Sequence, residues 1–527
     1  MTENHTAKAA RAAGMISMMF FFSRVLGFIR ENLSGRLFTR FQTDSFFAAF
    51  IIPDAMYYLL VGGALSAAFI PIFTEYLTRG EEEEAWKVAS TFMNITVLLL
   101  VSFTILGVTF TEWITPLEAP NFPPDKMELL VQLTRIMFPA VCFTAMAGMV
   151  GGALNSYRRF FAPALGPIFY NIAIILGAFF LGPRIGIHGM AFGVVAGAAG
   201  NFLIQASFLW RTGAKKHYRF GYIDLKNRGF RRMLILMVPA LIGLSADQAN
   251  IWATTAMASS LPEGSITALR FANRLVQLPI GIFANAISMA FFPLLSSLAA
   301  EKKIEQYKDT LSLALRSIIF LMVPAGIGLI TLRIPIVQLL FEGQKFTVEH
   351  TQLTAYALLF YSLTIFAHAS IIMLPRAFYS LQDTRTPVMV SIFAVSSSIL
   401  MNFLFLKFTH LGVGGFALSF SIMGLINMLL LTEVLRRKVG GIRGRSILTS
   451  FLKSLVASLA MGLVIELIKL GLGWYCERLG ITGHLESALL IMASMALGGL
   501  VFLGTAWALK MEELTMSLNM LKRKKVH

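Results

Sequence analysis

The chain has 527 residues, of which 56% are hydrophobic and only 14% are charged, with a mean hydropathy of +0.70 and a net charge of +17. Soluble domains carry about 25% charged residues, so this composition excludes a soluble globular protein and predicts a polytopic membrane protein. The apolar runs reach the ~20 residues that a helix needs to cross a bilayer, and the alternation of an outer-membrane barrel is missing, so the spans are expected to be helices.

Soluble-enzyme signatures are missing from the sequence. It has no glycine-rich phosphate loop, and its two cysteines, Cys142 and Cys476, give neither a disulfide framework nor a metal-ligand spacing. We therefore expect a protein that is not an enzyme and that holds no cofactor or metal.

The first predicted span carries Arg24, Arg30 and Glu31. An arginine in mid-bilayer costs roughly 2.5–3.5 kcal/mol on insertion scales, so it normally faces a cavity or a partner. Arg24 and Glu31 share a helix face, which leaves a local ion pair as the alternative to a substrate site. Arg24 is the stronger candidate for function, because Arg30 can reach the interface with its long side chain.

The second span of each half is too long for a straight crossing. It runs from Asp44 to Tyr76 in one half and from Ile266 to Leu298 in the other, with prolines at similar places, such as Pro53 and Pro279. Proline removes a helix hydrogen bond and bends the chain, so matched bends are expected. They serve either packing alone or the lining of a cleft. Asp44 is read either as a helix cap or as a ligand.

The seventh and eighth spans carry the remaining polar candidates. Asp247 of the seventh span is expected to bind a coupling cation or proton, or to pair with an arginine. Arg270 and Arg274 of the eighth span lie one helical turn apart on one face. Like charges at that spacing are unfavourable, so an anion is expected to meet them, at Arg274 above all. Guanidinium groups suit phosphate, which predicts a phosphate or diphosphate substrate.

The basic residues gather in alternate loops, a pattern that follows the positive-inside rule rather than the pattern of a nucleic-acid-binding protein. The basic segments are 158–159, 211–232, 302–308, 376–385, 436–445 and 522–525. The loops between them, such as 111–127 and 259–265, are nearly free of Lys and Arg. Both termini are therefore expected in the cytoplasm, which requires an even number of spans.

Breakers and apolar runs predict an all-α membrane protein of about fourteen transmembrane helices. The predicted parts are an N-lobe of six helices (1–210), a basic cytoplasmic linker (211–232), a C-lobe of six helices (233–437) and a C-terminal helix pair with a basic tail (438–527). Six helices per lobe make both lobes enter the membrane in the same direction, so the lobes are expected to form a parallel repeat.

Two sequence repeats support this duplication. Residues 64–71 (ALSAAFIP) return as residues 286–293 (AISMAFFP), and residues 186–191 (GIHGMA) return as residues 412–417 (GVGGFA). Both pairs are a little over two hundred residues apart. Two matches at nearly one spacing argue for a transporter built from two lobes around a central site.

Several of these segments together resemble those of the MurJ (MviN) lipid II flippases, in the multidrug/oligosaccharidyl-lipid/polysaccharide exporter superfamily. The segments are SRVLGFIRE at 23–31, TDSFFAAF at 43–50, AFIP at 68–71, ANRL at 272–275 and FYSLQDTRTP at 378–387. The similarity covers essentially the whole chain. It implies family-essential arginines at Arg24, Arg30 and Arg274, with acidic partners at Glu31 and Asp44.

The resemblance implies a monomeric flippase in the bacterial cytoplasmic membrane, whose partners are lipid II and membrane lipids. It implies that lipid II moves from the inner to the outer leaflet by alternating access. Some relatives place a sodium-binding aspartate where Thr254 falls here. The expected drive is therefore a coupling cation, with Asp247 and Thr254 as candidates, or the membrane potential. The alternatives are a flippase for another polyprenyl-diphosphate glycan and a cation-coupled drug antiporter, which the basic site disfavours.

Overall fold

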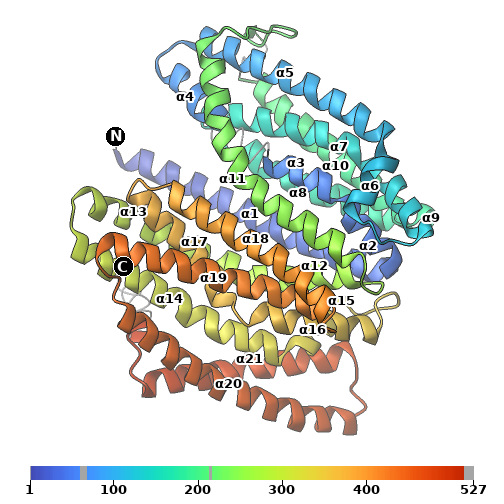
Figure 1. Cartoon of the computed structure of the whole chain (residues 1–527), viewed down its shortest axis with the longest axis vertical. Helices are drawn as coiled ribbons and strands as arrows, with labels where there is room; N and C mark the ends of the chain where they lie inside the picture. Colours follow the sequence, from blue (N-terminus) through green and yellow to red (C-terminus); the bar gives the residue numbers. More distant parts are fainter. Residues whose placement is uncertain (1, 60–67, 213–215, 516–527) are drawn as a thin grey trace. The chain divides into compact units, whose positions relative to one another are not determined.

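The computed structural model of the chain describes residues 2–59, 68–212 and 216–515, and within these ranges it is built of helices without strands (Figure 1). The first part holds α1 (Thr2–Leu37), α2 (Arg40–Ala49), α3 (Ile51–Tyr57), α4 (Ile70–Thr78), α5 (Glu82–Thr109), α6 (Thr111–Glu118), α7 (Pro124–Ser156), α8 (Phe161–Leu176), the π-helical turn η2 (Gly177–Leu181), α9 (Gly182–Ile185), α10 (His188–Trp210) and α11 (Arg228–Ala258). The second part holds α12 (Ser265–Pro279), the π-helical turn η4 (Ile280–Ala284), α13 (Asn285–Ala300), α14 (Ile304–Thr331), α15 (Arg333–Phe341), α16 (Val348–Ser362), α17 (Ile365–Ser380), α18 (Arg385–Phe408), α19 (Val413–Val439), α20 (Gly444–Arg478) and α21 (His484–Ala508).

The chain separates into two compact units. Unit 1 comprises residues 1–266 with 343–345, and unit 2 comprises residues 267–342 with 346–527. Each unit has its own apolar core. In unit 1, Phe69 just before α4, Phe73 of α4 and Trp86 of α5 are buried with residues of α7 and α10. In unit 2, α14 packs against the C-terminal pair α20 and α21 through residues that include Phe320 and Phe502, whose rings lie 5.2 Å apart.

Ten helices in the described ranges are long and apolar enough to cross a membrane, and the bent pair α16 and α17 raises the number to eleven. The predicted spans that miss this criterion are the first (α1), the second (α2 to α4, whose residues 60–67 lie outside the described ranges) and the seventh (α11). Most of the predicted site residues lie on these three segments. Polar side chains lower the hydropathy of a helix, and here they do so where a substrate site is expected.

The helix is irregular near the predicted proline in the second span of each half. In unit 1 the helix breaks at Phe50, between α2 and α3, close to Pro53. In unit 2 a π-helical turn, η4, follows Pro279 directly. Pro53 lacks the N–H that would bond the Ala49 carbonyl, and its ring pushes that carbonyl away, which explains the break at Phe50. Pro279 removes the bond to the Leu275 carbonyl in the same way, in the turn just before η4.

The turns between helices repeat in the two halves of the chain. Gly80 before α5 and Lys302 before α14 both have positive φ, of 78° and 57°, and so do Arg158 before α8 and Gln382 before α18, with φ of 58° and 60°. In all four turns the next residue donates its N–H to the carbonyl five residues earlier, as in a Schellman motif. Shared backbone geometry at matching positions supports a duplicated unit.

The second sequence repeat shows the same agreement. Gly186 and Gly412 stand just before α10 and α19, with φ of 63° and 52° and with ψ of −147° and −128°. An L side chain is strained in this region of φ, so both copies use glycine. The first sequence repeat cannot be compared, because residues 64–67 lie outside the described ranges.

Close backbone contact between α8 and α10 depends on glycine. A Cβ atom on Gly193 would lie 2.8 Å from the Ala173 carbonyl oxygen, and one on Gly197 would lie 2.8 Å from the Tyr170 carbonyl oxygen. Helices in membranes associate through small residues that let their backbones approach. These glycines therefore hold α10 against α8, and the two helices run side by side with α7 in Figure 1.

Candidate functional site

The three charged residues predicted on the first span all lie on α1. Arg24 is exposed, and the carbonyl of its neighbour Ser23 accepts a hydrogen bond from Asn171 Nδ2 of α8 at 3.2 Å. Glu31 is 3% exposed, and its Oε1 lies 3.4 Å from Nη2 of Arg30. The Arg30 guanidinium also lies 5.8 Å from the centre of the Phe50 ring. Glu31 thus forms an ion pair with its neighbour Arg30, whereas the side chain of Arg24 is exposed on the surface of α1.

Asp44 is buried inside α2 and does not cap it. Thr39 is the cap, because its hydroxyl accepts the N–H of Gln42 while the Gln42 side chain accepts the N–H of Thr39. Oδ2 of Asp44 lies 2.9 Å from Nζ of Lys126, in the first turn of α7, and accepts the N–H of Gly264 at 2.7 Å. The cap interpretation of Asp44 is therefore wrong. Its carboxylate instead joins α2, α7 and the segment before α12.

Arg270 and Arg274 lie on one face of α12, as their spacing predicts, and both are half-buried. An adjacent face of the helix is fixed by aromatic packing. The ring of Phe271 stacks on that of Phe341 with centres 4.3 Å apart and planes 13° apart. Asn273 forms a side-chain hydrogen bond with Tyr361 of α16. These contacts set the rotation of α12 and therefore the direction in which its two arginines face.

The candidate coupling-ion residues both lie on α11. Asp247 is exposed, and Thr254 is half-buried two turns further along. No three His, Cys, Asp or Glu side chains come together as a metal site within the described ranges. The role of Asp247 and Thr254 in binding a coupling ion stays a prediction from the sequence.

A buried arginine that the sequence analysis did not single out stands beside Asp44. Arg40, the first residue of α2, is 2% exposed and donates from Nη2 to the carbonyls of Gly35 at 2.6 Å and Phe38 at 2.8 Å. The carboxylates of Asp44 and Glu263 lie close enough to interact with the charge of Arg40. The spacing of Arg40 and Asp44, four residues in a helix, was a signal for charge interaction.

Glu118, at the end of the short helix α6, is a second buried charge that the sequence analysis missed. Its side chain is fully buried, and neither carboxylate oxygen has a hydrogen-bond partner within the described ranges. Burial raises the pKa of Glu118 to about 8. A carboxylic acid without partners is held in the neutral form, because burying the charged form would cost far more. Nothing in the local sequence signals this burial.

The basic linker predicted at 211–232, of which 211–212 and 216–232 are described, is held against α5 of unit 1. Tyr218 donates its hydroxyl to Oδ1 of Asn94 at 2.7 Å, and Nδ2 of Asn94 donates to the carbonyls of Arg219 and Tyr222. Arg219 also pairs with Glu83 at 2.9 Å. Glu83, in the first turn of α5, therefore serves as a docking point for the linker.

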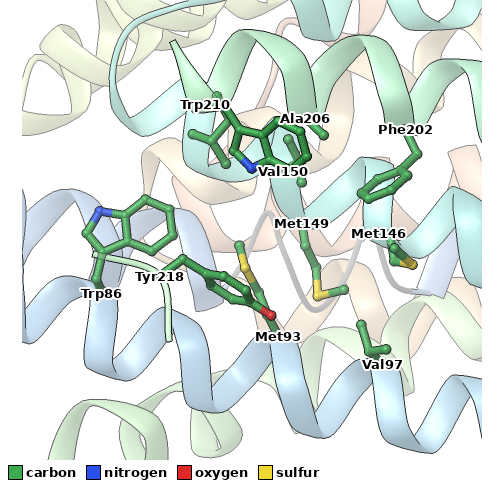
Figure 2. A pocket seen from close by; sticks show the side chains of 11 residues that line it. Trp86, Met93, Val97, Met146, Met149, Val150, Phe202, Ala206, Trp210 and Tyr218 are labelled. Carbon is green, nitrogen blue, oxygen red and sulfur yellow. The ribbon is translucent and has the colours of Figure 1, made fainter. Parts of the chain in front are cut away.

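An apolar cavity of about 150 Å³ lies beneath this linker. Figure 2 shows Trp86 and Met93 of α5, Met149 of α7 and Tyr218 of the linker around it. Methionine side chains are flexible and fill irregular space, which suits them to the wall of this cavity. The polar contacts of Asn94 hold the linker residue Tyr218 at this wall.

These features define a polytopic α-helical membrane transporter in which the first two spans, both low in hydropathy, carry buried or half-buried charge. The chain belongs to the lipid II flippase MurJ family, whose sequence model matches residues 33–476. A protein described as a probable lipid II flippase MurJ, from Buchnera aphidicola subsp. Acyrthosiphon pisum, is 32% identical over 460 residues, covering 86% of this chain and 89% of that protein.

The fold agrees with this assignment. A solved structure titled as lipid II flippase MurJ in an inward closed conformation superposes with a TM-score of 0.77 and 27% identity, covering 93% of this chain and 97% of that one. An inward-facing multidrug transporter of the MATE family superposes with a TM-score of 0.67 at 15% identity, covering 79% of this chain and 94% of that one. The second likeness shows a shared fold alone.

Proposed function

We propose that this chain is a flippase that moves lipid II, a polyprenyl-diphosphate-linked disaccharide peptide, from the inner to the outer leaflet of the bacterial cytoplasmic membrane. The observation that carries the proposal is the presence of arginines on a helix of each unit. Arg24 and Arg30 lie on α1, and Arg270 and Arg274 lie on α12. Membership in the family supports the choice of substrate.

The physical task is to move a diphosphate head group past hydrocarbon. A charged group alone in a low-dielectric medium is strongly disfavoured, so it needs a counter-charge at each stage. Guanidinium groups supply paired, planar donors that match phosphate oxygens. We assign diphosphate contacts to Arg24, Arg30, Arg270 and Arg274, while Glu31 and Asp44 set the charge and geometry around them.

The proposal includes alternating access in a bundle of fourteen spans, with lobes at 1–210 and 233–437, a linker at 211–232 and a C-terminal pair from 438 onward. The repeated left-handed turns support the duplication. The distribution of Lys and Arg supports cytoplasmic termini. The drive is either a cation that uses Asp247 or Thr254, or the membrane potential.

A second candidate in the same class is a flippase for another polyprenyl-diphosphate glycan. The observation behind it is that the proposed site consists of arginines, which read the diphosphate and not the sugar. Nothing in this pair of arginine-bearing helices distinguishes one glycan from another.

The function is tested by replacing the essential flippase of a bacterial host with this chain under controlled depletion. Restored growth, with no accumulation of lipid II in the inner leaflet, is the expected result. Lipid II accumulation despite a normal amount of inserted protein would contradict the assignment. If a host defective for another polyprenyl-diphosphate glycan were rescued instead, the second candidate would replace it.

A further inference from the structure

A polar cavity in unit 2 is lined by none of the residues assigned to substrate. It occupies about 280 Å³ where one end of α20 meets α14 and the segment after α21. A water molecule takes up about 30 Å³ in the liquid, so the cavity has room for a hydrated phosphate group. Three basic side chains, Arg445, Lys453 and Lys510, line it with the hydroxyls of Ser446 and Thr449.

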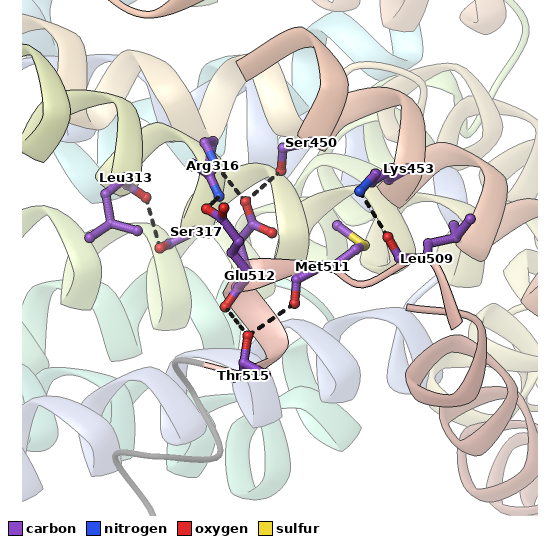
Figure 3. A network of polar contacts seen from close by, with 10 residues as sticks. Leu313, Arg316, Ser317, Ser450, Lys453, Leu509, Met511, Glu512 and Thr515 are labelled. Carbon is purple, nitrogen blue, oxygen red and sulfur yellow. Dashed lines mark hydrogen bonds and ion pairs between the residues drawn. The ribbon is translucent and has the colours of Figure 1, made fainter. Parts of the chain in front are cut away.

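The two carboxylates in the cavity wall are already bound to another basic residue. Arg316 of α14 donates from Nε to Glu513 and from Nη2 to Glu512, each at 2.6 Å. Figure 3 shows Arg316 pointing toward Glu512. Ser450 donates its hydroxyl to the same Glu513 at 2.9 Å. The hydrogen bond from Arg316 lowers the pKa of Glu512. Both carboxylates therefore serve to anchor the segment after α21 on α14.

The remaining charge in the cavity is positive. Four basic and two acidic side chains line it, which leaves two positive charges in excess. Lys453 donates to the Leu509 carbonyl at 2.8 Å. Neither Arg445 nor Lys510 forms an ion pair with any residue that the structure describes. The cavity thus offers hydrogen-bond donors and positive charge, and the fitting ligand is an anion that accepts hydrogen bonds.

The surface beside the cavity is apolar. Leu448, Leu452 and Val456 follow one another along α20 at four-residue spacing and are 58%, 50% and 54% exposed. Residues four apart lie on one face of a helix, so these side chains form a stripe that starts next to the cavity. A soluble phosphate ion has no apolar part that could contact this stripe, whereas the acyl chains of a lipid can lie along it. Basic pockets between transmembrane helices are known to bind anionic lipid head groups, whose acyl chains stay against the apolar helix surface.

We propose that this cavity binds the phosphate of an anionic phospholipid, with the acyl chains along Leu448, Leu452 and Val456. The lipid then bridges α14 and the C-terminal helix pair, next to the ion pairs of Arg316 with Glu512 and Glu513. Arg445 and Lys510 provide the charge that selects an anionic over a zwitterionic head group. This inference concerns residues outside the proposed flippase site and does not depend on which glycan is moved.

The test is native mass spectrometry of the purified full-length chain with equal amounts of phosphatidylglycerol and phosphatidylcholine. The wild type is expected to retain phosphatidylglycerol preferentially. Each basic residue near a membrane surface strengthens the binding of an anionic lipid several-fold, so Arg445→Ala with Lys510→Ala should weaken retention by roughly tenfold or more. The charge-conserving pair Arg445→Lys and Lys510→Arg should keep most of it.

The matched control is Lys302→Ala with Arg385→Ala. Lys302 has the same left-handed backbone as Lys510, with φ of 57° against 51°, and Arg385 begins α18 much as Arg445 begins α20. The control should retain lipid as the wild type does, and thermal unfolding should show that both double variants are folded. Equal retention of the two lipids by the wild type, or equal loss in the control, would overturn the proposal. Binding of inorganic phosphate without lipid preference would also overturn it.

Discussion

Asp44 of α2 and Lys126 of α7, which are 82 positions apart in the sequence, form an ion pair of 2.9 Å whose side chains are only 2% and 6% exposed. The same Asp44 oxygen accepts the N–H of Gly264. One carboxylate thus ties together three segments of unit 1. Lys126 also lies 4.4 Å from the centre of the Phe122 ring, which adds a cation–π contact to the pair.

Replacing Lys126 by Met should destabilise unit 1 strongly, because Asp44 would keep a buried charge without its partner. Breaking a buried ion pair from one side typically costs about 3–5 kcal/mol. The measurement is the thermal unfolding temperature of the purified protein in detergent. Adding Asp44→Asn to Lys126→Met should recover much of the loss, because the unpaired charge is removed. An unchanged unfolding temperature in Lys126→Met would show that the pair contributes nothing.

Glu118 should make the stability of unit 1 depend on pH. Its pKa rises from 4.5 to about 8 on burial, so between these values the folded state keeps a proton that the unfolded state has lost. Stability is therefore expected to be highest below about pH 4.5, to fall as the pH rises toward 8 and then to level off. Glu118→Gln should flatten this dependence when the unfolding temperature is followed between about pH 5 and pH 8.

A second substitution of Glu118, to leucine, gives the matching control. The short helix α15 in unit 2 corresponds to α6, and Leu340 occupies the same position after Leu332 that Glu118 occupies after Phe110. Glu118→Leu should therefore raise the unfolding temperature at neutral pH. Loss of stability in Glu118→Leu, or an unchanged pH slope in Glu118→Gln, would show that the carboxyl has an anionic role.

Gly193 and Gly200 of α10 should respond differently to alanine. A Cβ on Gly193 would lie 2.8 Å from the Ala173 carbonyl oxygen and from the Cα of Ile174, whereas a Cβ on Gly200 meets no atom within 4 Å. Forcing an extra methyl into packed helices typically costs about 1–3 kcal/mol. Gly193→Ala should lower the unfolding temperature, and Gly200→Ala should leave it unchanged or raise it slightly. Similar effects at both positions would refute the close packing of α8 and α10.

Arg24 and Arg274 should be needed for flipping and not for insertion. Arg24→Ala and Arg274→Ala are each expected to abolish complementation at normal protein abundance. Arg24→Lys should restore it only in part, because an ammonium group lacks the planar fork of donors. Arg437→Ala, which removes a surface ion pair with Glu433, is the control and should complement fully. Full activity of either alanine variant would remove that residue from the proposed site.

Single cysteines should report the proposed orientation after Cys142 and Cys476 are replaced by serine. Labels at Arg159 and Lys302, which are exposed in basic turns, should react with a membrane-impermeant reagent only from the cytoplasmic side. A label at Glu263, in a loop almost free of basic residues, should react only from outside. Lys524 serves the same purpose for the C-terminus, although it lies outside the described residues. The reverse pattern would invert the topology.

Much of the fold follows from the sequence, because the bilayer is a uniform apolar solvent. A run of about 20 apolar residues is enough to predict a spanning helix, and such runs predict α5, α7, α10 and most of the C-terminal half. Prolines predict the bends near Pro53 and Pro279 because the missing N–H is a property of the residue itself. The family, too, is evident in contiguous motifs such as residues 23–31.

The partners of the charged residues were decided by the tertiary structure. Hydropathy sums over neighbours in sequence, whereas an ion pair or a buried carboxyl depends on which helices pack together. The sequence alone predicts neither that Asp44 meets Lys126 nor that Glu118 is fully buried without a partner. It marks residues 211–232 as basic, but only the packed structure seats Tyr218 against α5. Charge and packing interactions act over a few ångströms in space, and the number of residues between two side chains in the sequence does not tell how far apart they are in the folded protein.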